Sequence, residues 1–296
     1  MKTFAENRNV VLALLAGSIA FMTSHAFAQT PFDKFSSEAA DSERSVDYSA
    51  IDRFYSSVTV QKGSRRNFRY SVLKGSGGNI LDAYVRSISS VKPTQLSKDE
   101  QLAYWLNLRN LLVVQAIAAE TPVRNLKNAR GDFDAPGDMW TRKRVTVEDV
   151  SVSIDDIERN IILKNWNNPN LIYGLYQGVK GGAGFVPPKA FKGTSIEEDL
   201  RSRAAYYINL HRTLRVKKSD VRTSAIYDWY KASLFGGDDQ QIIAHLKSHA
   251  QDRLAEDLKD VSTVSFVKMD YKLDEEQVRE QQQRYDIPRS SAPTGS

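Results

Sequence analysis

Residues 97–120 read SKDEQLAYWLNLRNLLVVQAIAAE, and this stretch decides the fold. Ser97 followed three residues later by Glu100 has the pattern of a capping box, which opens a helix by satisfying free backbone N–H groups. A long apolar run follows, and Pro122 stops it because proline cannot continue a helix. The stretch therefore predicts one long helix that ends at about Glu120.

Polar side chains interrupt this helix and make it a poor membrane span: Asn107, Arg109, Asn110 and Gln115. Asn107 and Asn110 are three residues apart and therefore share one helical face. A buried asparagine costs stability unless its amide is paired. The two amides either bond neighbouring backbone and fix the core, or they face a ligand. The sequence favours the first interpretation and leaves the second open.

Outside this helix, apolar periodicity predicts further helices and few strands. The helical patterns cover 46–60, 79–91, 154–162, 195–211, 224–234 and 238–258. Ser153 is placed to cap the third of these helices. Strand-like patterns occur near 144–147 and 264–273. We therefore expect a single α+β domain that is mostly helical, with a small β-sheet built from these two stretches.

The first 28 residues have the layout of a cleaved secretory signal. A charged start precedes an apolar run from Val10 to Met22, which is too short to stay in a bilayer as a spanning helix. Small residues, Ala26 and Ala28, then stand at positions −3 and −1 before Gln29. We predict that the mature chain starts at Gln29, has no transmembrane segment, and is periplasmic or secreted.

Composition excludes thiol chemistry. The chain has no cysteine, so disulfides, thiol redox chemistry and a cysteine nucleophile are ruled out. Its net charge of +5 at pH 7 is small for its length and gives a weak pull toward anionic partners. We expect residues 29–45 to be a flexible N-terminal segment, 46–274 the globular domain, and 275–296 a disordered tail.

One local excess of positive charge lies between residues 61 and 78. Its cations are Lys62, Arg65, Arg66, Arg69 and Lys74. Such a stretch is typical of a solvated basic loop or a short hairpin. An arm that contacts an anionic polymer is the alternative, although only Phe68 and Tyr70 are available there for stacking on bases.

Three further patterns carry little chemistry. The acidic run at 132–138 lacks the ligand spacing of a calcium loop and predicts an acidic turn. His245 and His249 have the spacing of two ligands on a helix, but no third ligand is suggested nearby, so we expect no metal. No nucleotide-binding motif is present, and we expect no cofactor. The glycines between 174 and 184 either let backbone N–H groups approach a ligand or form a flexible loop.

Several segments occur in a telling order: YWLNLRN within 96–110, TPVRNL at 121–126, Trp140, VSIDDIERNIIL at 152–163, IYDWY at 226–230, and 267–274. Together they resemble the domain of unknown function 547 family, from about Val46 to Asp274. This resemblance implies a fold and a cellular location more than it implies a reaction.

The chain departs from that family where the family carries imidazole and thiol groups. Ile172, Tyr176 and Gln177 stand against the family's His, Asn and Cys. Arg159 stands where a His often follows Ile-Glu. The residues that remain are Asn107, Asn110, Trp140 and Glu158. The resemblance therefore implies a member that has lost the groups needed for thiol chemistry.

These observations predict an exported soluble protein that acts by binding, with a degenerate active site. The candidate binding residues are Asn107, Asn110, Trp140 and Gln177, and the expected partner is an envelope ligand or protein. The alternative is an envelope hydrolase or transferase. In that alternative Glu158 is the acid or base and Asn107 or Gln177 orients the substrate, because a carboxylate in an apolar cleft can titrate near neutral pH.

Overall fold

The structure is a computed structural model and describes residues 30–62, 65–74, 76–184, 188–210 and 213–275. The predicted signal and residues 276–296 of the predicted tail lie outside the described residues. Contacts divide the chain after Thr30, and the description below concerns the unit that begins at Pro31. This unit is mostly helical with three small sheets, which confirms the α+β class.

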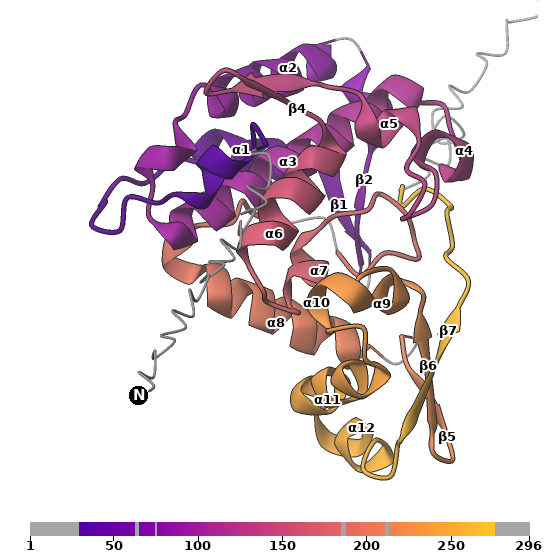
Figure 1. The fold of residues 1–296 in the computed structure, drawn as a ribbon. Helices are drawn as coiled ribbons and strands as arrows, with labels where there is room; N and C mark the ends of the chain where they lie inside the picture. The colour runs from indigo at the N-terminus through magenta and orange to yellow at the C-terminus, as the bar shows by residue number, and fades with distance from the viewer. Residues whose placement is uncertain (1–29, 63–64, 75, 185–187, 211–212, 276–296) are drawn as a thin grey trace, which may run out of the picture. The chain divides into compact units, whose positions relative to one another are not determined.

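The longer helices are α1 (Ser49–Val58), α2 (Ser76–Ser89), α3 (Lys98–Glu120), α8 (Ile196–Ile208) and α11 (Asp239–His249) (Figure 1). The short helices are α4 (Lys127–Arg130), α5 (Asp138–Thr141), α6 (Leu163–Asn165), α7 (Leu171–Gly174), α9 (Ile226–Trp229), α10 (Lys231–Leu234) and α12 (Asp252–Asp257). The other helical turns are η1 (Asp33–Ser36), η2 (Tyr70–Leu73), η3 (Pro93–Gln95), η5 (Gly193–Ser195) and the π-helix η4 (Asp156–Ile162). The strands are β1 (Thr59–Lys62), β2 (Arg65–Phe68), β3 (Val145–Val147), β4 (Val150–Val152), β5 (Arg215–Lys217), β6 (Asp220–Ser224) and β7 (Thr263–Val267).

Helix α3 is the central element of the core. Every residue from Glu100 to Val114 is buried, so the helix is covered on all sides. The elements packed against it include α2, α8 and η4. Among the described residues, α3 is the one helix long and apolar enough to cross a membrane, and 83% of its most apolar window is buried inside the domain. Its apolar surface is therefore used for packing within the protein.

The start of α3 differs from the predicted capping box. Ser97 is the N-cap, but its side chain makes no capping hydrogen bond. Glu100 accepts instead from two distant backbone groups, Val46 N–H at 3.0 Å and Gly193 N–H at 2.8 Å. The glutamate thus holds two loops against the helix, which satisfies its buried carboxylate better than a bond to its own N-cap.

The predicted small sheet is in fact three separate sheets. The stretch near 144–147 forms β3, which pairs with β4 in an antiparallel hairpin. The stretch near 264–273 contains β7, which pairs in parallel with β6, and β6 pairs antiparallel with β5. The basic stretch 61–78 contributes the third sheet, the hairpin of β1 and β2. The prediction of one sheet from 144–147 and 264–273 was therefore wrong, because strand pairing depends on contacts distant in sequence.

Part of the segment 29–45, which the sequence predicts to be flexible, packs against the core. Phe35 in η1 is 1% exposed. Its ring meets the indole of Trp105 on α3 edge to face, with 4.8 Å between ring centroids. Such an aromatic pair adds roughly 1 kcal/mol beyond the burial of its area.

The last described residues, 268–275, tie distant parts of the domain together. This segment continues from β7 toward α4 as an extended chain (Figure 1). On one side it bonds the loop before α4, through Leu126 N to Tyr271 O and Leu273 N to Arg124 O. On the other side it bonds the glycine-rich stretch, through Lys180 N to the carbonyl of residue 272 and the amide of residue 274 to Gly178 O. We call residues 268–275 the C-terminal strap.

Candidate functional site

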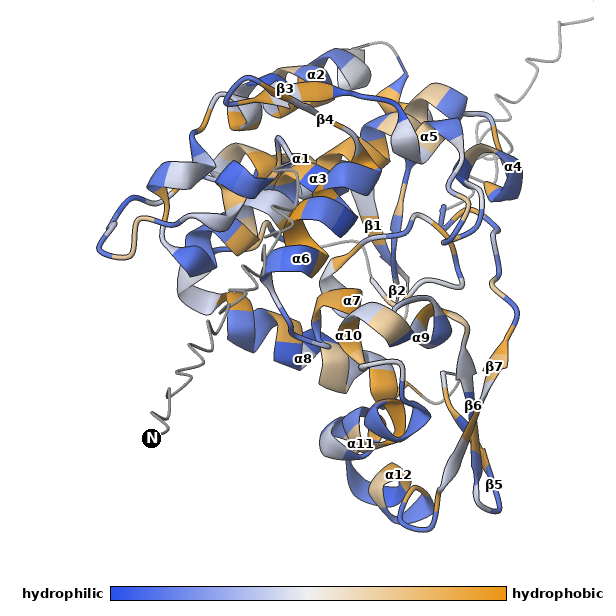
Figure 2. Ribbon diagram, viewed as in Figure 1, coloured by the Kyte–Doolittle hydropathy of each residue, from blue (hydrophilic) through white to orange (hydrophobic). Residues whose placement is uncertain are grey.

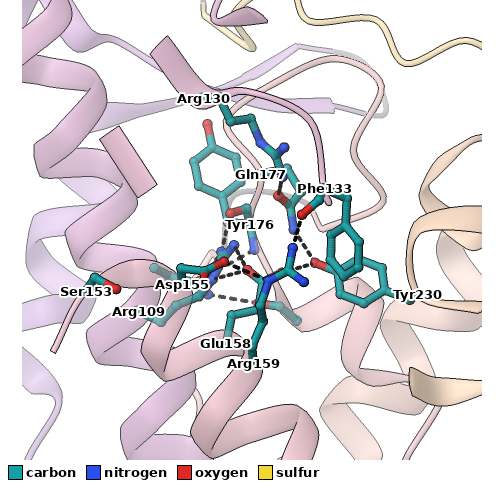
Figure 3. Close-up of polar contacts among 12 residues, drawn as sticks. Arg109, Arg130, Phe133, Ser153, Asp155, Glu158, Arg159, Tyr176, Gln177 and Tyr230 are labelled. Carbon is teal, nitrogen blue, oxygen red and sulfur yellow. Dashed lines mark hydrogen bonds and ion pairs between the residues drawn. The ribbon is translucent and has the colours of Figure 1, made fainter. Parts of the chain in front are cut away.

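A buried ion pair between Arg109 and Glu158 lies at the centre of the candidate site (Figure 3). Arg109 projects from α3, and Glu158 projects from η4, which packs against α3. Nη2 and Nε of Arg109 donate to Oε2 of Glu158 at 2.5 and 3.1 Å. The two side chains are 0% and 3% exposed. Two buried charges are tolerated only when further hydrogen bonds satisfy their remaining polar atoms.

The helix that carries Glu158 starts at a local signal. Asp156 N–H donates to Ser153 Oγ at 3.0 Å, and Ser153 N–H donates to Asp156 Oδ2 at 2.7 Å. This confirms the predicted capping role of Ser153. From Asp156 to Ile162 the turns widen into a π-helix, a rare form that is frequent at functional sites.

A chain of hydrogen bonds connects Glu158 to Gln177 and Arg130. Tyr230 O–H donates to Oε1 of Glu158 at 2.5 Å, and Gln177 Nε2 donates to the Tyr230 hydroxyl at 2.8 Å. Arg130 Nη2 donates to Oε1 of Gln177 at 2.5 Å. Burial raises the pKa of Tyr230 well above its ordinary value, so the phenol keeps the proton that it donates. The chain is therefore a fixed sequence of donors and acceptors.

Trp140 contacts a cation inside the domain. The guanidinium of Arg130 lies 4.6 Å from the ring centre of Trp140 and 4.4 Å from that of Trp229. Burial lowers the pKa of Arg130, and the two indole faces stabilise its charge where water cannot. The predicted binding residue Trp140 is itself buried. In the structure, the indole of Trp140 packs against the guanidinium of Arg130.

The two asparagines of α3 bind different parts of the backbone. Asn110 donates to Gly174 O at 2.9 Å and accepts from Tyr176 N–H and from Arg109, both at 3.1 Å. Asn107 binds both backbone groups of Phe191, donating to O at 2.8 Å and accepting from N–H at 2.9 Å. Asn110, Trp140, Gln177 and Glu158 therefore gather around Arg109 and Arg130. Asn107 has its own partner outside this group.

The charge state of Glu158 follows from its neighbours. Burial alone would raise the pKa of this carboxyl. The nearby charges of Arg109 and Arg130 and the Tyr230 hydrogen bond outweigh burial, and they leave the pKa lowered. Glu158 is therefore an ionised acceptor whose two oxygens are both bound. We call Arg109, Arg130, Glu158, Gln177 and Tyr230 the buried polar network.

Sequence reasoning missed three members of this site. Arg109 entered only as an interruption of an apolar run, and Arg130 and Tyr230 were not considered as partners. An arginine inside a long apolar helix was nevertheless a signal, since a buried guanidinium requires an acceptor. The identity of the acceptor could not be predicted from residue spacing, because Glu158 is 49 residues away from Arg109 in the sequence.

The comparisons with known proteins give a family for the middle of the chain. Residues 93–208 match the sequence model of a family described as "Protein of unknown function, DUF547". This segment, less than half of the chain, is similar to that family. It contains α3, η4 and the loop of Gln177, while Tyr230 and Trp229 come from outside the matched segment. No curated protein and no solved structure matches the chain significantly.

The positions at which the sequence analysis expects departures from the DUF547 family are filled by well-packed groups. Tyr176 shares a hydrogen bond with the hydroxyl of Tyr70 at 2.9 Å, and both rings are buried. Arg159 donates to Asp155 Oδ1 at 2.7 Å and to Phe133 O (Figure 3). Its guanidinium lies 4.1 Å from the ring centre of Phe133. These side chains are therefore integrated into the domain.

The glycines of the DUF547 segment between 174 and 184 permit close packing. Gly178 has a φ of +71°, which strains any other residue. A Cβ on Gly184 would lie 2.1 Å from Leu175 O, and one on Gly181 would lie 2.6 Å from the amide of residue 270. Gly181 and Gly182 also give their N–H groups to carbonyls of the chain. Close contacts with other parts of the domain account for these glycines, and at Gly181 the contact is with the C-terminal strap.

Three cavities among the described residues can be placed, and the buried polar network lines none of these three. A cavity of about 190 Å³ lies beside the glycines and includes Lys180, Ser224 and Lys268 in its lining. One of about 360 Å³ lies at the start of α8, and one of about 830 Å³ lies between α12 and β5. The network therefore opens into none of these three cavities.

The basic stretch 61–78 is partly used within the fold. Arg66 donates to Thr59 Oγ1 at 3.0 Å, and Arg69 donates to Ser57 O at 2.5 Å. Lys74 is exposed. The side chains of Lys62 and Arg65 lie outside the described residues. Contact with an anionic polymer at this hairpin stays a prediction.

The two helical histidines lie in an aromatic cluster. The hydroxyl of Tyr173 is 2.9 Å from both Tyr227 Oη and His245 Nε2. The rings of His245 and His249 are 4.9 Å apart. Among the residues that the structure covers, no group of three His, Cys, Asp or Glu side chains is placed to hold a metal ion. Burial, reinforced by the neighbouring His249, lowers the pKa of His245 to about 3.

Acid will destabilise the protein through His245. In the unfolded chain this imidazole titrates near pH 6.5, so between about pH 6.5 and 3 the unfolded state binds the extra proton. Stability is therefore complete above pH 6.5 and is lost as the pH falls. From about pH 7.5 to 4.5 we expect the wild type to lose about 2–3 kcal/mol more unfolding free energy than His245→Gln. Urea titrations at both pH values measure this, and His249→Gln is the neighbouring control with a smaller expected difference.

Proposed function

We propose that this protein is exported and acts by binding, with the buried polar network as internal framework. The observation that carries this proposal is the state of Glu158. The carboxylate is almost fully buried, ionised, and bound through both oxygens to Arg109 and Tyr230. A general acid or base must reach a substrate and exchange a proton with it. Glu158 has no access to a substrate and no proton to donate as an acid, and both of its oxygens are already bound and so are not free to accept a proton as a base.

Export is supported by the layout of residues 1–28. A short apolar run after a charged start, with small residues before Gln29, is what a signal peptidase recognises. The lack of cysteine suits an oxidising compartment, because no thiol is available there for unwanted pairing. The proposed location of the mature protein is the periplasm or the medium.

The alternative of an envelope hydrolase or transferase makes a different demand. It requires Glu158 to leave Arg109 and Tyr230 and to meet a substrate in a cleft. Asn107 and Gln177, its proposed orienting groups, are also committed to Phe191, Arg130 and Tyr230. The described geometry supports a rigid framework more directly than this reaction.

One expression experiment tests both parts of the proposal. The full-length chain is produced in a Gram-negative host, and the product in the periplasm and medium is sequenced from its N-terminus. We expect it to start at Gln29, and we expect Ala28→Lys to block this cleavage. The purified product is then incubated with peptidoglycan fragments, and mass spectrometry is used to look for cleavage or transfer products. We expect none.

Two results would overturn the proposal. Retention of the uncleaved chain in the cytoplasm would remove export. Turnover by the wild type that disappears in both Glu158→Gln and Tyr230→Phe, with each variant folded by circular dichroism, would make the network catalytic. Equal turnover in all three preparations would identify a contaminating enzyme.

A further inference from the structure

The sheet of β5, β6 and β7 has one face turned to solvent. The strand register places Arg215 opposite Arg222, and Arg222 beside Ser265. Alternate residues of a strand share a face, so this face comprises Arg215, Lys217, Asp220, Arg222, Ser224, Thr263, Ser265 and Val267. The opposite face carries Val216, Val221, Thr223, Val264 and Phe266, which are buried or half-buried. The sheet therefore separates the core from a polar surface.

This solvent face is strongly basic. Its exposed cations are Arg215, Lys217 and Arg222, with Lys218 in the turn and Lys268 just after β7. Figure 2 shows β5 and the turn after it with hydrophilic residues. Within the described chain, none of these five side chains forms a salt bridge or a hydrogen bond. We call these five residues the basic sheet face.

The arrangement of charge on the face is unfavourable for the isolated protein. Arg215 and Arg222 are direct cross-strand partners, and like charges in that position destabilise a sheet. Asp220, the one acid on the face, is bound by hydroxyls: Thr263 donates to one oxygen at 3.0 Å and Ser265 to the other at 2.8 Å. Its carboxylate forms no ion pair with either arginine in the described structure.

Acidic groups on the surrounding elements offset only part of this charge. Asp252 and Asp257 of α12 share the 830 Å³ cavity with Arg215, and Asp257 lies 3.8 Å from Arg253 of its own helix. Asp270 lies in the lining of the 190 Å³ cavity, where Lys180 adds a further amine beside Lys268. The face keeps an excess of positive charge after these groups are counted.

We infer that the basic sheet face docks on an anionic phospholipid surface. Cations spread over neighbouring strands, roughly 5 Å apart, match a two-dimensional array of phosphate headgroups. Arginine binds phosphate oxygens through two parallel donors, and a pair of arginines without counterions is suited to that contact. No aromatic side chain is present among the residues of this face, so bases and sugar rings have nothing to stack on.

This inference deepens the proposed binding function by naming a partner, and it can fail alone. A failure to bind lipid does not predict the result of the turnover assay. Turnover in that assay likewise does not predict whether the protein binds lipid. The contact requires neither a spanning helix nor a lipid anchor, because polybasic surfaces associate with anionic membranes by charge.

Vesicle sedimentation with the purified mature protein tests the inference. We expect binding to phosphatidylcholine vesicles that contain phosphatidylglycerol and none to phosphatidylcholine alone. Binding should weaken as salt shortens the Debye length. The variant Arg215→Gln/Lys217→Gln/Arg222→Gln should bind about 100-fold more weakly, since each basic side chain near the surface contributes roughly fivefold. These side chains are exposed, so the variant should fold.

A matched control changes the net charge equally elsewhere. Arg53, Arg86 and Lys92 are exposed, and in the described structure their side chains form no hydrogen bond or salt bridge. Their replacement by glutamine should leave vesicle binding near the wild-type level. Equal loss in both triple variants, no loss in the first, or wild-type binding to uncharged vesicles would overturn the inference. Binding to soluble polyphosphate without binding to vesicles would overturn it as well.

Discussion

Replacing Glu158 by glutamine will lower the free energy of unfolding by roughly 3–5 kcal/mol, the cost of leaving a buried charge without its partner. Arg109 is fully buried and donates twice to this carboxylate. A neutral amide cannot balance the guanidinium, and water cannot reach it. Urea denaturation followed by tryptophan fluorescence near neutral pH measures the change.

Controls separate the ion pair from a general effect of substitution. Glu120→Gln, at the exposed end of the same α3, should change stability by less than about 0.5 kcal/mol. In the double variant Arg109→Met/Glu158→Leu the loss should be well below the sum of the single losses, because no charge is then left unpaired. Additive losses, or a Glu158→Gln protein as stable as the wild type, would contradict the framework role.

Asn107→Ala should cost about 3 kcal/mol, because it leaves both backbone groups of Phe191 buried without partners. The amide of Asn107 donates to the carbonyl and accepts from the N–H of that residue. Each orphaned buried group costs about 1–3 kcal/mol. The same urea titration measures the loss, with the exposed Asn79→Ala on α2 as the near-neutral control.

The outcome for Asn107 decides between the two interpretations left open by the sequence. A residue that faces a ligand would change binding and leave stability of the free protein nearly intact. A stable Asn107→Ala protein would therefore contradict the geometry described here. A large loss would make the asparagine a clamp between α3 and the loop before α8.

The features that could be predicted from the sequence depend mostly on interactions between residues close together in the chain. Helix α3 and the Ser153 cap were predictable because periodicity and capping depend on residues a few positions apart. The stretch 224–234, predicted as one helix, begins at the end of β6 and then forms α9 and α10. Strand β6 was missed because its partner β7 lies about forty residues further along the chain.

The candidate site shows the same division. The residues Asn110, Trp140, Glu158 and Gln177 were selected from the sequence, and the structure brings them together around two arginines. Their mutual arrangement depends on Tyr230, which is 72 residues from Glu158. Such pairings depend on the completed fold, and the spacing of residues along the chain does not predict them.

The C-terminal strap also bears on how this protein folds. Residues 268–275 bond both the loop before α4 and the glycine-rich stretch, and both of these regions precede the strap by a long stretch of chain. The two regions therefore stay unjoined in the nascent chain until the strap itself has been synthesised. Contacts between residues so far apart in sequence form slowly, so we expect the strap to dock late in folding.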